Sequence, residues 1–156
     1  EDNSGKLIHS LKQKSLSYAR NKSIDFLIID APPGIGCPAI ASLVGVNILI
    51  VILEATQSGF HDAKNIIELA KNKNIRVFGV INKGGINKEL EDEIRNYLRS
   101  ENIELLGEIP FKKEIAVLLK EKKLMSDVSD RIFKENLMGI FSKIKEIGEK
   151  SDEQRA

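Results

Sequence analysis

Four short apolar runs stand out along the chain, and each is continuous rather than alternating with polar residues. They are DFLIID (25–30), NILIVIL (47–53), RVFGVIN (76–82) and ELLGEIP (104–110). Continuous runs of this length are typical of strands that are buried on both faces, as in parallel sheets. The pattern therefore predicts four parallel strands.

Around these runs, apolar residues recur at helical spacing. The spacing predicts helices over about 59–72 and 87–100, one before the first strand with Ser4 as its cap, one near Pro38 and one near the C-terminus. The residues that define these apolar faces are Leu7, Ile8, Leu11, Ser15 and Tyr18; Phe60, Ala63, Ile66, Ile67 and Ala70; Leu90, Ile94, Tyr97 and Leu98; and Phe133, Leu137, Ile140, Phe141 and Ile144.

Strands that alternate with helices through short connections predict right-handed βαβ units. The expected fold class is α/β, an open parallel sheet with helices on both faces. We expect one domain over residues 1–150 and a frayed tail over 151–156.

Composition narrows the class of protein. The 156 residues carry 24 Lys and Arg against 23 Asp and Glu, so the net charge of +1 gives no reason to expect a nucleic-acid partner. One cysteine excludes an internal disulfide and fits a reducing compartment. No apolar run reaches the roughly 18–20 residues of a membrane span, and the polar N-terminus does not resemble a signal peptide. We therefore expect a cytoplasmic protein.

Each predicted strand is followed by residues suited to a site. Asp30 precedes APPGIG, Glu54 precedes ATQSG, Asn82 precedes KGG, and Pro110 ends the last run. The carboxyl ends of parallel strands meet at one edge of a sheet, where ligands of open α/β folds bind. The sequence therefore predicts a site at this edge.

The first of these strand ends has the Walker-B arrangement of phosphate-transfer proteins, an aspartate followed by a turn with glycine. Asp30 would hold Mg²⁺ through a water molecule, and Gly34 would let a backbone N–H approach a γ-phosphate oxygen. Pro32 and Pro33 would stiffen the turn. The alternative is that Asp30 only caps the next turn.

Three stretches together, DAPPGIGCP, EATQSGFHD and VINKGGIN, closely resemble the MinD/ParA-type deviant Walker-A ATPases. They are most similar to the subfamily with an inserted ferredoxin-like domain that binds a [4Fe–4S] cluster. The resemblance covers about residues 4–125. It implies a three-layer P-loop NTPase fold, binding of ATP and Mg²⁺, hydrolysis of ATP to ADP and phosphate, and a homodimer or a paired homologous ATPase. An iron–sulfur or redox protein is the implied partner.

The chain also departs from this family pattern. The family begins with a strand and a Gly-rich loop, typically ending Gly-Lys-Thr, that holds the β- and γ-phosphates. No such loop occurs here, and NSGKL (3–7) has Leu7 where a Ser or Thr has to bind Mg²⁺. One cysteine cannot bind the cluster, which is expected in an upstream region. We therefore expect the C-terminal half of such an ATPase, incomplete because the Walker-A strand and loop are absent, and inactive alone.

The resemblance also assigns the third strand end. Asn82, followed by Lys83, would recognise the purine edge, and the loop at Pro110 would pack around the base. Guanine-specific proteins need an acid at the position of Gly85, so adenine is favoured. The alternative is that Asn82 caps its own turn.

After the second strand, the resemblance places Glu54, Thr56, Ser58 and Asp62 near the γ-phosphate or the partner subunit. Asp62 is the candidate that positions water. The alternative is helix capping, with Ser58 as N-cap and Asp62 in the first turn.

The cysteine and the histidines give weaker signals. Cys37 could be a redox sensor at a helix N-terminus, but a small buried hydrophobe is the favoured interpretation. His9 and His61 have no second ligand at metal-binding spacing.

Three functions follow from these patterns. The leading hypothesis is a nucleotide-switch ATPase that passes its state to a redox or metal-cluster partner. The second is a MinD-type positioning ATPase that binds membrane through residues 131–150. The polar face there mixes Glu and Lys, so covering the sheet is favoured and membrane binding is not expected. The third is a non-catalytic split subunit.

Overall fold

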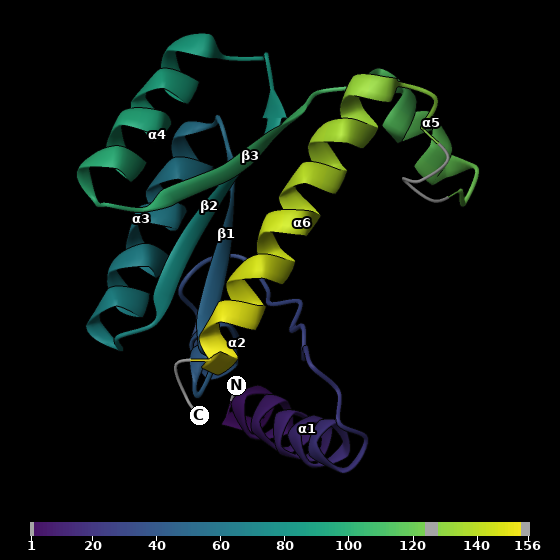
Figure 1. Ribbon diagram of the computed structural model, residues 1–156. Helices are drawn as coiled ribbons and strands as arrows, with labels where there is room; N and C mark the ends of the chain where they lie inside the picture. The colour runs from purple at the N-terminus through teal and green to yellow at the C-terminus, as the bar shows by residue number, and fades with distance from the viewer. Residues whose placement is uncertain (1, 124–127, 154–156) are drawn as a thin grey trace.

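The computed structural model describes residues 2–123 and 128–153, which form three strands and six helices (Figure 1). In chain order the elements are α1 (Asp2–Asn21), α2 (Cys37–Leu43), β1 (Ile48–Glu54), α3 (Gln57–Asn72), β2 (Arg76–Gly84), α4 (Lys88–Ser100), β3 (Glu104–Pro110), α5 (Lys113–Lys120) and α6 (Arg131–Glu153).

The three strands form one parallel sheet in the order β1-β2-β3, as predicted for these runs. β1 pairs with β2 along its whole length, from Ile48 opposite Arg76 to Glu54 opposite Asn82. The register of β2 against β3 shifts between Gly79 and Val80 and again between Ile81 and Gly84, and Gly84 lies opposite Pro110. The α/β class with a parallel sheet is confirmed.

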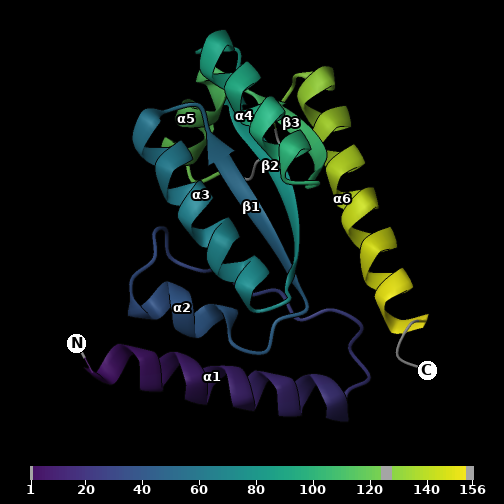
Figure 2. The ribbon, with the colours of Figure 1, turned by 90° about the vertical axis from the view of Figure 1, so that its left-hand side faces the viewer.

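One face of the sheet is covered by α3 and α4, which are the crossover helices (Figure 2). Alternate side chains of β1 and β2 enter this layer, among them Leu53 and Ile81, which are fully buried. The rings of Phe60 and Tyr97 meet edge to face at 5.4 Å between centroids and join α3 to α4. Both segments therefore form helices that bury the apolar faces predicted for them.

The other face is covered by α6, which packs against β3. Phe133 and Ile140 of α6 are buried, and Ile140 lies against Gly107, where an added Cβ would come within 2.6 Å of its Cγ1 atom. Phe141, predicted on the same buried face, is 57% exposed instead. α6 covers the β3 side of the sheet, whereas Ile52 of β1 remains 56% exposed.

The predicted strand at 25–30 is not formed. Residues 24–30 have no regular secondary structure, and Ile28 is 81% exposed. A strand forms only where a neighbouring strand takes its backbone hydrogen bonds, and within the described residues no strand lies beside this segment. The prediction was wrong because an apolar pattern does not supply a partner.

The N-terminal helix α1 is formed, but it packs on α2 rather than on the sheet. Lys12, which is buried, donates to the carbonyl oxygens of Ser42, at 2.8 Å, and Val44, and so caps the end of α2. Burial lowers the pKa of the Lys12 amine below its usual range. The predicted face of α1 is largely exposed, and Ser4 lies inside the helix rather than at its cap.

Two further differences concern the C-terminal third. Helix α5 was not predicted. Residues 151–153, predicted as part of a frayed tail, continue α6, while 154–156 lie outside the described residues.

Candidate functional site

The predicted residues of the second, third and fourth strand ends gather at the carboxyl edge of the sheet. Strand pairing places Glu54 of β1 opposite Asn82 of β2, and Gly84 opposite Pro110 of β3. The backbone N–H of Phe111 donates to the carbonyl of Gly84 at 2.8 Å, which joins the two turns. Residues from three separate strands are thus brought together by tertiary structure.

An ion pair bridges the ends of β1 and β2. The Lys83 Nζ atom lies 2.8 Å from one carboxylate oxygen of Glu54 and 2.9 Å from the other. Both side chains are partly exposed, so the pair adds little stability and can be opened by a ligand. Lys83 also has a positive φ of 57°, which is uncommon for a residue with a side chain.

Asn82 caps its own turn. Its Oδ1 atom accepts the backbone N–H of Lys83 at 2.9 Å, so the capping alternative from the sequence describes a contact that is present. A role in base recognition therefore has to use the same side chain that shapes the turn.

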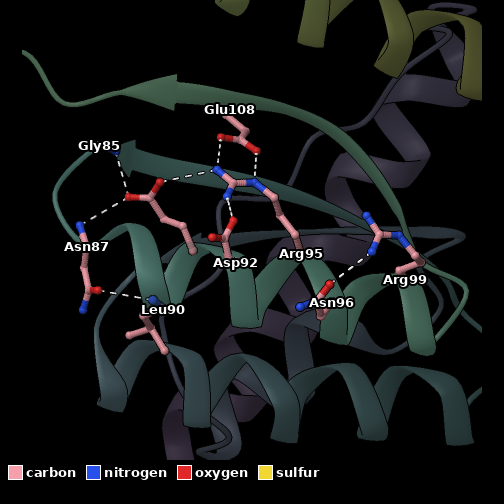
Figure 3. Close-up of polar contacts among 9 residues, drawn as sticks. Gly85, Asn87, Leu90, Asp92, Arg95, Asn96, Arg99 and Glu108 are labelled. Atoms are coloured by element: carbon pink, nitrogen blue, oxygen red, sulfur yellow. Dashed lines mark hydrogen bonds and ion pairs between the residues drawn. The ribbon is translucent and has the colours of Figure 1, made fainter.

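The turn after β2 is held from behind by Glu91, a residue that the sequence analysis missed. Its side chain is buried, and its Oε1 atom accepts the N–H groups of Gly85 at 2.8 Å and Asn87 at 3.3 Å (Figure 3). Asn87 is the N-cap of α4, and its Oδ1 atom accepts from Leu90 N–H at 3.2 Å. Gly85 has φ of 94°, so this turn requires glycine.

Arg95 links α4 to β3 in the same close-up (Figure 3). Its Nε and Nη2 atoms lie 2.6 and 2.7 Å from the two oxygens of Glu108, and Nη1 lies 2.6 Å from Asp92. These acids raise the pKa of the guanidinium, with the hydrogen bond to Glu108 the largest cause. The four-residue spacing of Glu91 and Arg95 on one helix is the sequence signal that could have indicated their contact.

The start of α3 has a side-chain cap, but the residues that the capping alternative named do not provide it. Thr56, not Ser58, is the N-cap, and its Oγ1 atom accepts from Gly59 N–H at 3.1 Å. Ser58 is exposed inside the first turn, and Asp62 is exposed one turn further on. The catalytic role predicted for Asp62 stays a prediction.

Asp30 and Gly34 are not brought to this edge. They lie in the connection between α1 and α2, which Figures 1 and 2 both show beside α2, toward the end of the sheet where β1 begins. Asp30 is exposed, and Gly34 has φ of 82°. Cys37 is exposed at the first residue of α2, so its predicted burial was wrong.

Polar side chains and the backbone of two turns meet at this edge, and no strand of the described chain leads into a Gly-rich phosphate loop. Across residues 2–123 and 128–153, no group of three or more His, Cys, Asp or Glu could hold a metal ion. The role of Asp30 in holding Mg²⁺ through water stays a prediction.

None of the helices in the described part of the chain combines the length and apolar character that a membrane span needs.

Solved structures share this fold at low sequence identity. The MinD cell division protein of Aquifex aeolicus matches with a TM-score of 0.69 and 15% identity, over 85% of this chain and 58% of that one. The MinC:MinD cell division protein complex of the same organism matches with a TM-score of 0.72 and 14% identity, over 88% and 59%. At these identities the likeness shows the fold alone.

Sequence relatives occur in Methanocaldococcus jannaschii. Uncharacterized protein MJ0578 is 30% identical over 146 residues, which are 94% of this chain and 48% of that protein. Uncharacterized ATP-binding protein MJ0685 is 32% identical over 98 residues, which are 61% of this chain and 38% of that protein. The chain thus spans about half the length, or less, of these curated relatives.

The family itself is shown by a match that covers nearly the whole chain. The family model described as ParA: NUBPL iron-transfer P-loop NTPase matches residues 4–145. Together with the parallel sheet, its crossover helices and the polar strand ends, this match shows that the chain belongs to the ParA family of P-loop NTPases, in the NUBPL iron-transfer group.

Proposed function

We propose that this chain forms the base-binding and switch part of an ATP-dependent nucleotide switch of the MinD/ParA type, which acts with an iron–sulfur or redox partner. The observation that carries the proposal is the convergence of Glu54, Asn82, Lys83 and Pro110 at the carboxyl edge of paired parallel strands. The iron-transfer description of the family supports the choice of partner. The name of the relative MJ0685, an ATP-binding protein, supports an adenine nucleotide as the ligand.

The turn after β2 favours adenine over guanine. Guanine presents two N–H donors on one edge and needs a carboxylate to accept them. Gly85 has no side chain, and its φ of 94° is strained for any replacement. The nearby acid Glu91 is buried and already accepts two backbone N–H groups. An Asn82 amide can pair with adenine without such an acid.

The hydrolytic part of the proposal concerns Asp30, Gly34 and Asp62. Asp30 would bind Mg²⁺ through water, Gly34 would donate its N–H to the γ-phosphate, and Asp62 would orient the attacking water. The segment with Asp30 and Gly34 lies apart from the edge, so these roles require it to approach the edge. Such a movement is what a switch requires.

The iron–sulfur part concerns a partner rather than this chain alone. The chain has one cysteine, whereas a [4Fe–4S] cluster is held by four thiolates. The cluster ligands therefore come from elsewhere, and a homodimer or a homologous ATPase would complete the nucleotide site.

The proposal is tested by adding Mg-ATP or Mg-GTP to the chain, up to millimolar concentration, while the backbone amide signals of 82–87 and of Phe111 are followed by NMR. We expect weak ATP binding centred on these turns, weaker GTP binding, and about a tenfold loss of ATP affinity in Asn82→Ala. Asn72→Ala, at the exposed end of α3, is the matched control and should bind ATP unchanged. Absence of any shift at these amides would overturn the proposal.

The membrane-positioning alternative would have to use other residues of α6, because Ile140 and Ile144 pack against the sheet and Phe133 is buried. A non-catalytic split subunit differs from the proposed switch in one respect. In the split subunit, an added phosphate-loop chain would bind ATP without any change in the amide signals around Asp30.

A further inference from the structure

A buried carboxylate lies behind the turn that would receive the base. The Glu91 side chain is an acid that is only 4% exposed. A buried carboxyl group is tolerated only when its oxygens are paired, and the oxygens of Glu91 contact the turn and Arg95. Oε1 accepts from Gly85 and Asn87, and Oε2 lies 3.4 Å from Arg95 Nη2.

The turn itself is held in an uncommon conformation. Lys83 and Gly85 both have positive φ, at 57° and 94°. Backbone of this kind persists only where the surroundings determine it at several points. Here the points are the Asn82 side chain on Lys83 N–H, the Lys83–Glu54 ion pair, and the Glu91 carboxylate on Gly85 and Asn87.

Arg95 then fixes this turn against the next strand end. Its two-point contact with Glu108 uses the planar fork of the guanidinium, which a lysine cannot reproduce. Glu108 lies two residues before Pro110, and Phe111 N–H donates to Gly84. The turn after β2 and the turn after β3 are therefore tied together at two places.

We propose that Glu91 and Arg95 are positioning residues for base recognition. Glu91 holds the 82–87 turn in the shape that presents Asn82, and Arg95 holds β3 and the turn at Pro110 beside it. This inference rests on the proposed function, because it assigns the residues that make that site selective.

The experiment compares Mg-ATP with Mg-GTP in the full 156-residue chain by the same amide signals. In Glu91→Gln, which keeps the volume and removes the charge, we expect ATP affinity to fall about tenfold and the ATP-over-GTP preference to approach one. Arg95→Lys should reduce the preference by a smaller factor. Glu89→Gln, an exposed carboxylate in the first turn of α4, is the matched control and should keep both values.

The ratio of ATP affinity to GTP affinity distinguishes a positioning role of Glu91 and Arg95 from a general contribution to the stability of the fold. A variant that only loosens the fold lowers ATP and GTP affinity by the same factor, and that result would overturn the inference while leaving the proposed function intact. Hydrogen exchange gives a second measurement that needs no nucleotide. In Glu91→Gln the amides of Gly85 and Asn87 should exchange at least tenfold faster, while Val80 and Ile81 stay unchanged.

If the unaltered chain binds neither nucleotide, the proposed function fails, and base recognition by these residues fails with it. Exchange at Gly85 and Asn87 still decides whether Glu91 shapes the turn. Unchanged exchange in Glu91→Gln would overturn that part as well.

Discussion

The unit formed by β1–β3 with α3, α4 and α6, here called the sheet unit, contrasts with the N-terminal segment, residues 2–46. Both contain a strongly apolar run. ILIVIL (48–53) pairs with β2 along its length, and Leu53 is fully buried. IDFLII (24–29) is nearly as apolar, yet it forms no strand, and Ile28 is 81% exposed.

The difference between the two runs is a neighbouring strand rather than composition. Each strand of the sheet unit has a partner for its N–H and C=O groups and a helix over at least one face. Within the N-terminal segment, α1 is joined to α2 by packing and by the buried amine of Lys12. Leu43 of α2 packs against Ala70 and Ile75 of the sheet unit. Apolar sequence thus creates a tendency to be buried, and only pairing converts it into a strand.

The largest effect expected from this comparison is a core truncation. Ile94 of α4 is fully buried, so Ile94→Ala should lower the free energy of unfolding by about 2–5 kcal/mol. Ile28→Ala removes the same atoms from an exposed position and should change it by less than about 0.5 kcal/mol. Urea unfolding measures both, and a loss in Ile28→Ala equal to that in Ile94→Ala would refute the contrast.

A pair of glycines sharpens the account of the α6 face. Gly107→Ala places a Cβ 2.6 Å from Ile140 Cγ1 and should destabilise the fold by about 1–3 kcal/mol. Gly139 lies in α6, and a Cβ added there in Gly139→Ala would meet no atom within 4 Å. This variant should stabilise the fold by about 0.5–1 kcal/mol. Opposite shifts in the thermal midpoint are expected. A neutral Gly107→Ala would mean that α6 is not seated on β3 in solution.

The contact between α1 and α2 within the N-terminal segment is tested at Lys12. Lys12→Met keeps the length of the side chain and removes the bonds to Ser42 and Val44 carbonyls, so we expect a loss of about 1 kcal/mol. Hydrogen exchange should speed up in α1 and α2 and stay unchanged in β2. Lys14→Met, on an exposed part of α1, is the control. Faster exchange in β2 would show that the two regions unfold together.

The smallest effect concerns the start of α6. The hydrogen bond from Lys112, together with the N–H of Phe133, holds the pKa of Asp130 below its usual 3.8. Because the pKa is lower in the folded state, the stabilisation is present above about pH 3.8 and is lost as pH falls through the folded pKa. Asp130→Asn should therefore be less stable than the unaltered chain at neutral pH and equal to it well below the folded pKa.

Lys112→Met removes the partner of Asp130 and should have a similar effect, and the double variant should be little worse than either single one. Additive losses would mean that the two residues act separately.

Much of the sheet unit followed from local pattern. The three runs at 47–53, 76–82 and 104–110 and the helices between them were predicted to within about two residues, because period and β-branched content act over short distances. The polar strand ends at Glu54, Asn82 and Pro110 were also predicted to share one edge, which follows from parallel strands alone.

Other features depended on residues far apart in the chain. The burial of Glu91, the fork between Arg95 and Glu108, and the exposure of Cys37 are set by which elements pack together. The choice of Thr56 rather than Ser58 as N-cap is local, but it depends on where α3 begins after β1 ends.

By itself, the sequence determined the class of fold, the family resemblance and the order of strands and helices, because these arise from the spacing of apolar residues and from short motifs. The tertiary structure alone decided which apolar runs became strands and which carboxylates were buried. The physical reason is that backbone pairing and burial of charge are properties of two segments in contact, and the sequence of one segment does not specify which other segment it contacts.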